Sequence, residues 1–272
     1  MAPGVYFSLS NEDYHRGEGI SKSQLDDIAI SMAIYHWRKK APEDEEKKEP
    51  LTVGTALHCL LLEPDAFSER FVSMPDFNRR SNAGKEEEKC FREEMAGSGK
   101  TILSGEIWRK LFLMRDSTYA HPSARWLLDK PGHCEASIYW TDKETGVLCR
   151  TRPDKFLSGM PVIIDVKKIA DMARFPRHIA EFRYHVQDAF YRESFRESYG
   201  ETPMFVFIVV SDTIDCGRYP VRVYSLSPYD VDVGTHLFRS NLQTYAQAMI
   251  SGDWGGIEEI TRPDWDKRND FL

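Results

Sequence analysis

The chain has 272 residues and a net charge of −7, and 41% of its residues are hydrophobic. This composition supports a sizeable packed core and excludes a disordered chain. The excess of acids argues mildly against a broad nucleic-acid-binding surface, although an acidic protein can still hold bases in a local groove.

Cysteine usage and hydropathy indicate the compartment. No apolar run approaches the roughly 20 residues needed to span a membrane, and the N-terminus has neither region of a secretion signal. The five cysteines are scattered and include no CxxC pair. Such a set predicts neither a disulfide framework nor a zinc site. We therefore expect a cytoplasmic protein without a membrane partner.

The first half of the sequence predicts mainly helices. Residues 19–40 place apolar side chains at helical spacing, with Ser21 and Ser23 as candidate caps. A second helix is expected at 53–63, stopped by Pro64. Residues 73–100 are polar and predict a loop that leads into a helix, and residues 102–128 are again helical in pattern.

The segment GSGKT at 97–101 resembles a phosphate-binding loop. The full pattern needs glycine at position 94, where this chain has Glu94. The loop should also follow a buried strand, yet the preceding residues are charged and helical in pattern. We therefore interpret the segment as a glycine-rich turn.

The pattern changes near Gly132. Short strands are expected at 133–140, 146–154 and 161–167, a helical segment at 175–200, strands at 203–212 and 219–227, and a final helix capped by Ser227. This order predicts a mixed α/β core with a helical N-terminal half. Because no repeat or long linker interrupts it, one domain is expected.

Residues 161–168, PVIIDVKK, end an apolar run on an acid and two lysines. Asp165 is expected at the end of a strand, projecting into a cleft where Asp154 of the adjacent strand would meet it. Two carboxylates this close repel each other unless a cation lies between them, and oxygen ligands favour Mg²⁺ or Mn²⁺. The strand period returns Lys167 to the face of Asp165. The set predicts metal-assisted phosphodiester hydrolysis, and its alternative is a solvated strand end.

Two helical features add to this set. His58 lies in a helix of otherwise apolar residues, where it is either a core histidine or a metal ligand. Gln187 and Tyr191 lie four residues apart on one helix face. They are either an incidental polar pair or groups that reach DNA phosphates or water.

Taken in order, Gly54 to His58, Asp154, Asp165-x-Lys167 and Gln187 to Tyr191 resemble the RecB-type branch of the PD-(D/E)xK nuclease superfamily. The sequence segments RPDKF, IIDVKK and YHVQDAFY are most similar to those of nuclease domains of the exonuclease VIII (RecE) type. The resemblance implies a restriction-endonuclease-like fold, a mixed β-sheet core flanked by helices. It implies one nuclease domain over 1–272, with a helical part at 1–131 and a nuclease core at 132–272, in what could be the C-terminal part of a longer protein.

The resemblance also implies site roles. The catalytic Mg²⁺, which Mn²⁺ can replace, would be held by His58, Asp154, Asp165 and the carbonyl of Val166. Lys167 would activate water, and Gln187 would contact the phosphate or that water. The sequence departs from the pattern at Asp165, where many relatives carry a longer glutamate, and at Lys168, where relatives often place threonine.

The DNA-binding residues implied are Ser21 and Ser23 at a helix start, Gln187, and Tyr191 on the DNA-binding face. Arg152 is either a phosphate clamp or a surface arginine. The implied activity is a double-stranded DNA exonuclease that degrades the 5′-ended strand and leaves 3′ single strands for recombination. A homo-oligomeric ring (tetramer or trimer) and a RecT-like single-strand annealing partner are implied as well. The alternatives are a structure-specific endonuclease on the same core and a catalytically inactive DNA-binding scaffold.

Overall fold

A computed structural model describes residues 1–42, 52–257 and 259–267, so the predicted domain 1–272 extends beyond the described residues at 43–51, 258 and 268–272. The strands are β1 (Gly4–Tyr6), β2 (Phe71–Ser73), β3 (Thr101–Leu103), β4 (Gly132–Cys134), β5 (Ser137–Thr141), β6 (Leu148–Thr151), β7 (Lys155–Leu157), β8 (Val162–Ile169), β9 (Met204–Ser211) and β10 (Val221–Tyr224). The helices are α1 (Asn11–Arg16), α2 (Lys22–Ile30), α3 (Met32–Lys40), α4 (Thr52–Leu62), α5 (Pro64–Arg70), α6 (Asn82–Ser98), α7 (Gly105–Ala120), α8 (Pro122–Asp129), α9 (Phe175–Glu181), α10 (Tyr184–Tyr199), α11 (Pro228–Ser251) and α12 (Asp264–Lys267), with a 3₁₀ turn, η2, at Met172–Arg174.

The central sheet has five strands in the order β10-β9-β8-β7-β4. Strands β8 and β9 run parallel along their whole length, whereas the other neighbours are antiparallel. Strand β7 pairs with β8 at Lys155↔Ile164 and Phe156↔Ile163. Beyond Ile164, no described strand lies along this edge of β8, so its backbone groups there are free to bind something else.

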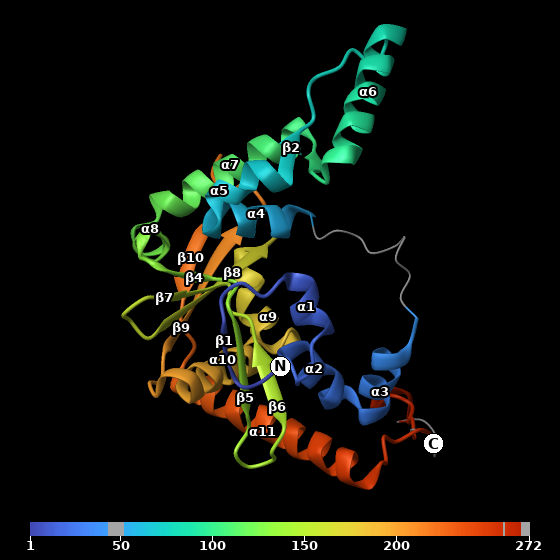
Figure 1. Cartoon of the computed structure of the whole chain (residues 1–272), viewed down its shortest axis with the longest axis vertical. Coiled ribbons are helices and arrows are strands. Elements are labelled where there is room, and N and C mark those ends of the chain that lie inside the picture. The colour runs from blue at the N-terminus through green and yellow to red at the C-terminus, as the bar shows by residue number, and fades with distance from the viewer. Residues whose placement is uncertain (43–51, 258, 268–272) are drawn as a thin grey trace.

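Helices cover both faces of the central sheet (Figure 1). Ile164 and Val166 of β8 face a core shared with α4, α5, α7 and α8. Ile163 and Ile169 face the opposite way, toward a core shared with α9 and α10. Because side chains alternate along a strand, Asp165 and Lys167 lie on this second face, beneath α10.

A three-stranded antiparallel sheet, β1-β5-β6, lies beside the central one. A third core joins β5 and β6 to α2, α3, α10 and α11. The N-terminal helices α2 and α3 therefore pack on the same body as the C-terminal half. Together with the pair β2-β3, these layers form the mixed α/β, restriction-endonuclease-like fold that was predicted.

The predicted elements differ from the observed ones mainly where a single cap ends a helix. Ser31 separates α2 from α3 and accepts a hydrogen bond from the backbone N–H of Ile34. His121 separates α7 from α8, which begins at Pro122. The turn predicted at GSGKT is limited to Gly99 and Lys100, because α6 runs to Ser98, Gly99 follows at a φ of 69° and β3 begins at Thr101.

Two further predictions concern the ends of elements. Ser227 caps α11 as predicted, accepting from the N–H of Asp230, with Pro228 in the first turn. The strand expected at 146–154 is shorter, because β6 ends at Thr151 and β7 begins at Lys155. None of the helices in the described residues is long and apolar enough to cross a membrane.

Candidate metal and active site

Two neighbouring stretches of chain pass from one sheet to the other at the same place. Strands β4 and β7 pair in the central sheet, and their continuations β5 and β6 pair in the three-stranded sheet. The crossing points are Glu135, which lies between β4 and β5, and residues 152–154, between β6 and β7. The backbone N–H of Glu135 donates to the carbonyl of Asp154 at 3.1 Å. We call this crossing, residues 135–136 and 152–154, the seam.

Asp154 leaves the seam toward the unpaired edge of β8. Its Oδ2 accepts a hydrogen bond from the backbone N–H of Val166 at 2.7 Å. The same oxygen lies 3.5 Å from Nδ1 of His58 on α4. In an extended strand the N–H and C=O of one residue point to the same side, so the carbonyl of Val166 also faces this edge. The carboxylate thus replaces the strand partner that β8 lacks here.

Asp165 and Lys167 come together as the strand period predicts. Nζ of Lys167 lies 2.7 Å from Oδ2 of Asp165. Nε2 of Gln187, on α10, donates to Oδ1 of the same carboxylate at 2.5 Å. One expectation was wrong: Asp165 is not an exposed strand end, because β8 continues to Ile169 and the residue is only 2% exposed.

Burial and mutual repulsion set the charge state of these groups. Burial raises the pKa of Asp154, and Asp165 raises it further, while His58 and Lys167 oppose them. Burial alone would lower the pKa of Lys167, but Asp165 and Asp154 outweigh it and leave that pKa raised. Three carboxylates, of Asp154, Asp165 and Glu135, thus lie near two side chains that carry a permanent positive charge, Lys167 and Arg152. An excess of carboxylates is the condition that favours a bound cation.

The donor set fits a divalent cation. Ligand atoms of His58, Glu135 and Asp154 all lie within 4.8 Å of one another. Oδ2 of Asp165 is buried, and its one close partner among the described residues is the ammonium of Lys167 at 2.7 Å. Carboxylate oxygens, a backbone carbonyl and one imidazole suit Mg²⁺ or Mn²⁺ rather than a thiolate-binding metal.

Glu135 is the residue that sequence reasoning missed. It had been placed inside a single strand at 133–140, whereas β4 ends at Cys134 and β5 begins at Ser137. Burial raises the pKa of its carboxyl, and Asp154 adds to that rise. A lone acid between two apolar runs was the one signal available in the sequence.

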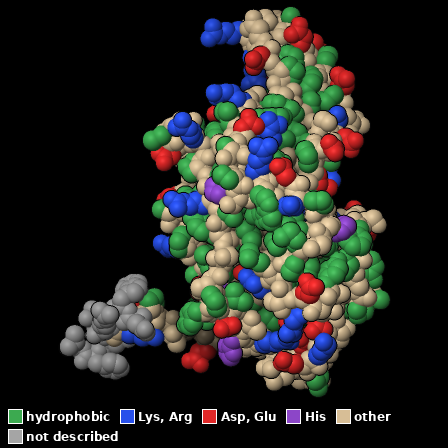
Figure 2. All heavy atoms as spheres, turned by 90° about the vertical axis from the view of Figure 1, so that its left-hand side faces the viewer, with side chains coloured by type: hydrophobic (Ala, Val, Ile, Leu, Met, Phe, Trp, Pro, Cys, Tyr) green, Lys and Arg blue, Asp and Glu red, His purple; other side chains and the backbone are tan. Residues whose placement is uncertain are grey.

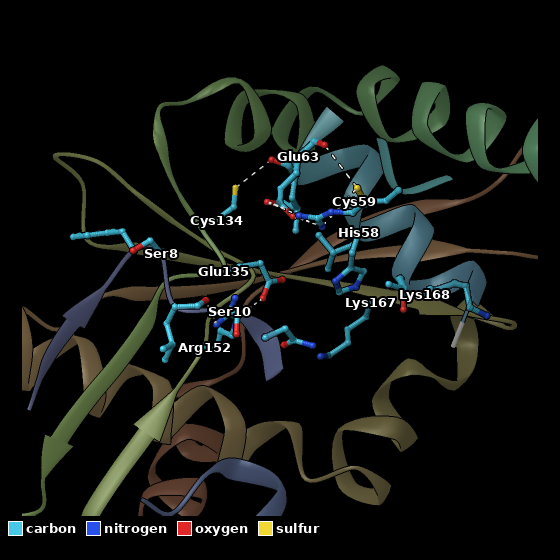
Figure 3. A pocket seen from close by; sticks show the side chains of 18 residues that line it. Ser8, Ser10, His58, Cys59, Glu63, Cys134, Glu135, Arg152, Lys167 and Lys168 are labelled. Carbon is cyan, nitrogen blue, oxygen red and sulfur yellow. Dashed lines mark hydrogen bonds and ion pairs between the residues drawn. The ribbon is translucent and has the colours of Figure 1, made fainter. Parts of the chain in front are cut away.

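His58, Glu135 and Lys167 line a cavity of about 800 Å³, whereas Asp154 and Asp165 are not among its lining residues (Figure 3). Helix α4 contributes His58, β8 contributes Val166 and Lys167, and the seam contributes Glu135 and Arg152. The segment from Phe7 to Asn11, which follows β1, forms another wall. On the face drawn in Figure 2, lysines and arginines stand singly or in small groups among acidic and apolar side chains.

Of the predicted DNA contacts, Gln187 and Tyr191 lie inside the protein. Gln187 is 8% exposed and faces Asp165 rather than the cavity. The Tyr191 hydroxyl hydrogen-bonds with the backbone of Arg152, and burial raises its pKa, with Tyr14 and Asp165 adding to the rise. Their roles toward DNA stay predictions.

The remaining candidates lie at the start of α2 and on the seam. Ser21, which is buried, donates its backbone N–H to Oε1 of Gln24 at 2.9 Å, and Ser23 is exposed. Neither lines the cavity, although Lys22 between them is close enough to Lys167 for the two charges to interact. Arg152 is not a surface residue, because its side chain is 11% exposed and pairs with Glu135, and its role as a phosphate clamp stays a prediction.

Comparison with known proteins supports this fold. The model of a family described as "PDDEXK-like domain of unknown function (DUF3799)" matches residues 21–258. A crystal structure of a "Putative exonuclease" from Eubacterium rectale is similar at 14% identity and a TM-score of 0.63, with 97% of this chain and 94% of that chain covered. At this identity the likeness shows a shared fold.

A second solved structure, that of SSO0001, is 12% identical over 69% of this chain and 84% of that chain, with a TM-score of 0.30 that is too low to support an argument. No curated protein matches the sequence significantly. The match to the family model covers most of the chain and includes every metal-ligand candidate. The chain therefore belongs to the DUF3799 family of PDDEXK-like domains, within the PD-(D/E)xK nuclease superfamily.

Proposed function

We propose that this protein is a metal-dependent exodeoxyribonuclease that degrades the 5′-ended strand of duplex DNA. The observation that carries the proposal is the meeting of Asp154, Asp165 and Lys167 at the unpaired edge of β8. Asp154 comes from a different segment of the chain than Asp165 and Lys167, yet its carboxylate accepts a hydrogen bond from the N–H of Val166, which lies between those two residues. The family match supports the same reaction class.

Each group has a task that its position allows. His58, Asp154, Asp165 and Glu135 would hold the cation, with the Val166 carbonyl facing the same edge. When bound, Mg²⁺ would polarise the scissile phosphate and lower the pKa of a bound water. Lys167, positively charged beside Asp165, would stabilise the negative charge that develops on the phosphate. Gln187 fixes the orientation of Asp165 through its hydrogen bond to Oδ1.

End-dependence, polarity and assembly rest on similarity. The structurally similar protein carries the name "Putative exonuclease", and the sequence motifs resemble those of nucleases of the exonuclease VIII type. From that resemblance we infer 5′ to 3′ polarity, a product with a 3′ single strand, a ring-shaped homo-oligomer and a single-strand annealing partner. Light scattering on the purified chain tests the assembly, and co-purification with an annealing protein tests the partner.

The activity test uses a linear duplex labelled at one 5′ end, with and without a 5′ phosphate, beside a closed circle. Reactions in Mg²⁺, Mn²⁺ and EDTA are compared for the wild type and for Asp165→Ala. We expect metal-dependent release of labelled mononucleotide from the linear duplex, an intact circle, and no activity in Asp165→Ala.

Each of the other outcomes would indicate a different activity. Cutting of the circle would replace the proposal by a structure-specific endonuclease on the same core. Binding without cutting at any metal concentration would leave a DNA-binding scaffold. Cleavage by Asp165→Ala at the wild-type rate would show that this site does not perform the reaction.

A further inference from the structure

Glu135 has an unusual backbone conformation at the seam. Its φ is 53°, in the left-handed region that side chains other than glycine rarely adopt. Such strain persists where the surroundings hold the residue, and it concentrates at functional sites. Two contacts hold Glu135: its N–H binds the carbonyl of Asp154 at 3.1 Å, and its Oε2 accepts from Nε of Arg152 at 2.9 Å.

Arg152 is held by several protein groups besides Glu135. Its Nη1 donates to the carbonyl of Leu9 at 3.1 Å and to Oγ of Ser137 at 2.9 Å. The guanidinium also lies over the ring of Tyr14, 5.5 Å from its centroid. Nε and Nη1 are thus both bound by protein groups, so the side chain is fixed in place before any ligand arrives.

We propose that Arg152 is a positioning residue, which holds Glu135 as a protein ligand beside His58 and Asp154 for the cation that the proposed function requires. The inference rests on that proposed function. Arg152 binds Oε2 of Glu135 and leaves Oε1 for the cation, because each carboxylate oxygen offers its own lone pairs. In Figure 3, Glu135 and Arg152 lie on one side of the cavity, and His58 and Lys167 lie on the other.

The proposal assigns Arg152 an effect that passes through Glu135. Groups that orient a metal ligand from behind typically change metal affinity by about 10- to 100-fold when they are removed. A phosphate clamp would instead change DNA affinity, and a purely structural ion pair would change stability without changing metal binding. These three roles differ in what can be measured on the protein alone.

The experiment is a double-mutant cycle read by Mn²⁺ binding without DNA, using electron paramagnetic resonance of the free ion. It compares the wild type, Glu135→Gln, Arg152→Gln and the double variant. Arg125→Gln is the matched control, because Arg125 pairs with the exposed Asp129 on α8. We expect each single variant at the seam to bind Mn²⁺ about 10-fold more weakly or worse. The double variant should bind no more weakly than Glu135→Gln, because Arg152 then has nothing left to position.

Several results would overturn the inference. One is wild-type Mn²⁺ affinity in either single variant. Another is a double variant whose loss of Mn²⁺ binding free energy equals the sum of the losses in the two single variants. A fall in duplex affinity measured in EDTA, with Mn²⁺ binding unchanged in Arg152→Gln, would make Arg152 a DNA contact instead.

The design separates this inference from protein folding and from the proposed function. If Arg152→Gln fails to melt cooperatively, Arg152→Lys takes its place in the cycle, because lysine keeps the charge but cannot reach Glu135, Leu9 and Ser137 together. The Mn²⁺ affinities of the single variants and of the double variant are then compared in the same way. Mn²⁺ binding is read without cleavage, so a protein that binds Mn²⁺ through Glu135 yet cuts no DNA refutes the nuclease and leaves the positioning role standing. A wild type that binds no Mn²⁺ refutes the positioning role.

Discussion

The backbone N–H of Val166 donates to Oδ2 of Asp154 at 2.7 Å, so the strand that carries Asp165 also orients the acid that faces it. This bond forms because the β7–β8 ladder ends at Ile164 and leaves the next N–H on that edge without a strand partner. A strand three residues long at β7 is therefore a condition for the site. A longer β7 would pair with Val166 and displace the carboxylate.

Lys167→Met should remove cleavage while it preserves metal binding. Methionine has a similar length, so the change removes the charge that lies 2.7 Å from Oδ2 of Asp165 and little else. Because that charge opposes the negative charge on the reacting phosphate, we expect the single-turnover rate to fall by about 100-fold or more. Lys143→Met is the control. Lys143 lies in the turn of the β5–β6 hairpin, is exposed, and pairs with Glu197 on α10. Equal rates in Lys167→Met and the wild type would contradict this role.

Gln187→Leu should reduce stability rather than DNA affinity. The amide of Gln187 is buried and donates to Oδ1 of Asp165 at 2.5 Å. Its removal leaves a buried carboxylate oxygen without that donor, so the free energy of unfolding should fall by about 1–3 kcal/mol. Urea denaturation measures the loss, and duplex binding in EDTA should be unchanged. Weaker duplex binding with unchanged stability would instead support a direct contact with phosphate.

Two helical glycines should respond in opposite ways to alanine. A Cβ added at Gly54 on α4 would meet nothing within 4 Å, whereas one at Gly234 on α11 would lie 2.1 Å from the carbonyl oxygen of His185. Gly54→Ala should therefore raise the free energy of unfolding by up to about 0.5–1 kcal/mol. Gly234→Ala should lower it by about 1–3 kcal/mol or more, because α10 and α11 must move apart.

The pair also tests what Gly54 is for. Gly54 lines the cavity, so the absence of a side chain there leaves space for a ligand and serves no packing contact within the protein. We expect Gly54→Ala to be stable yet slower in cleavage. A destabilised Gly54→Ala, measured by thermal denaturation, would show instead that the position has a packing role.

The stability of the protein should fall as pH rises through the titration of Asp188. Asp188 is fully buried on α10, and burial raises its pKa against the opposing effect of Arg192. At pH values between the usual pKa of an aspartate, about 4, and the raised pKa of Asp188, the native state holds more protons than the unfolded state. In that window the free energy of unfolding must decrease with rising pH.

Asp188→Asn removes this titration and provides the reference. Urea unfolding of both proteins in EDTA, from about pH 4 to about pH 7, gives the difference in stability as a function of pH. The wild type should lose stability relative to Asp188→Asn as the pH rises. A relative gain would mean that the pairing with Arg192 outweighs burial.

The alternation of β8 could be predicted from the sequence, because Ile163, Asp165 and Lys167 lie two residues apart on a buried strand. That pattern gave the shared face of Asp165 and Lys167, which the 2.7 Å contact confirms. The order of helices and strands after Gly132 was also predictable from periodicity, but the short strands β1, β2 and β3 in the N-terminal half were not predicted. The break at Ser31 was not predicted, since the apolar spacing continues across it and one capping serine decides the boundary.

The seam lay beyond what periodicity can predict. A strand that leaves one sheet for another keeps its alternating side chains, so residues 133–140 and 146–154 each looked like one strand. Glu135 was missed for that reason, and Arg152 could not be assigned. Their positions depend on which strands pair, β4 with β7 and β5 with β6, and on where each pairing ends.

The seam also determines when the site becomes ordered. Glu135, Arg152 and Asp154 lie between strands that are already paired on both sides, so their backbones lose conformational freedom when the protein folds. A cation or a DNA end then meets ligands that need little further ordering, and more of the interaction energy is available for affinity and catalysis. Folding thus bears the entropic cost of building the site before any ligand binds.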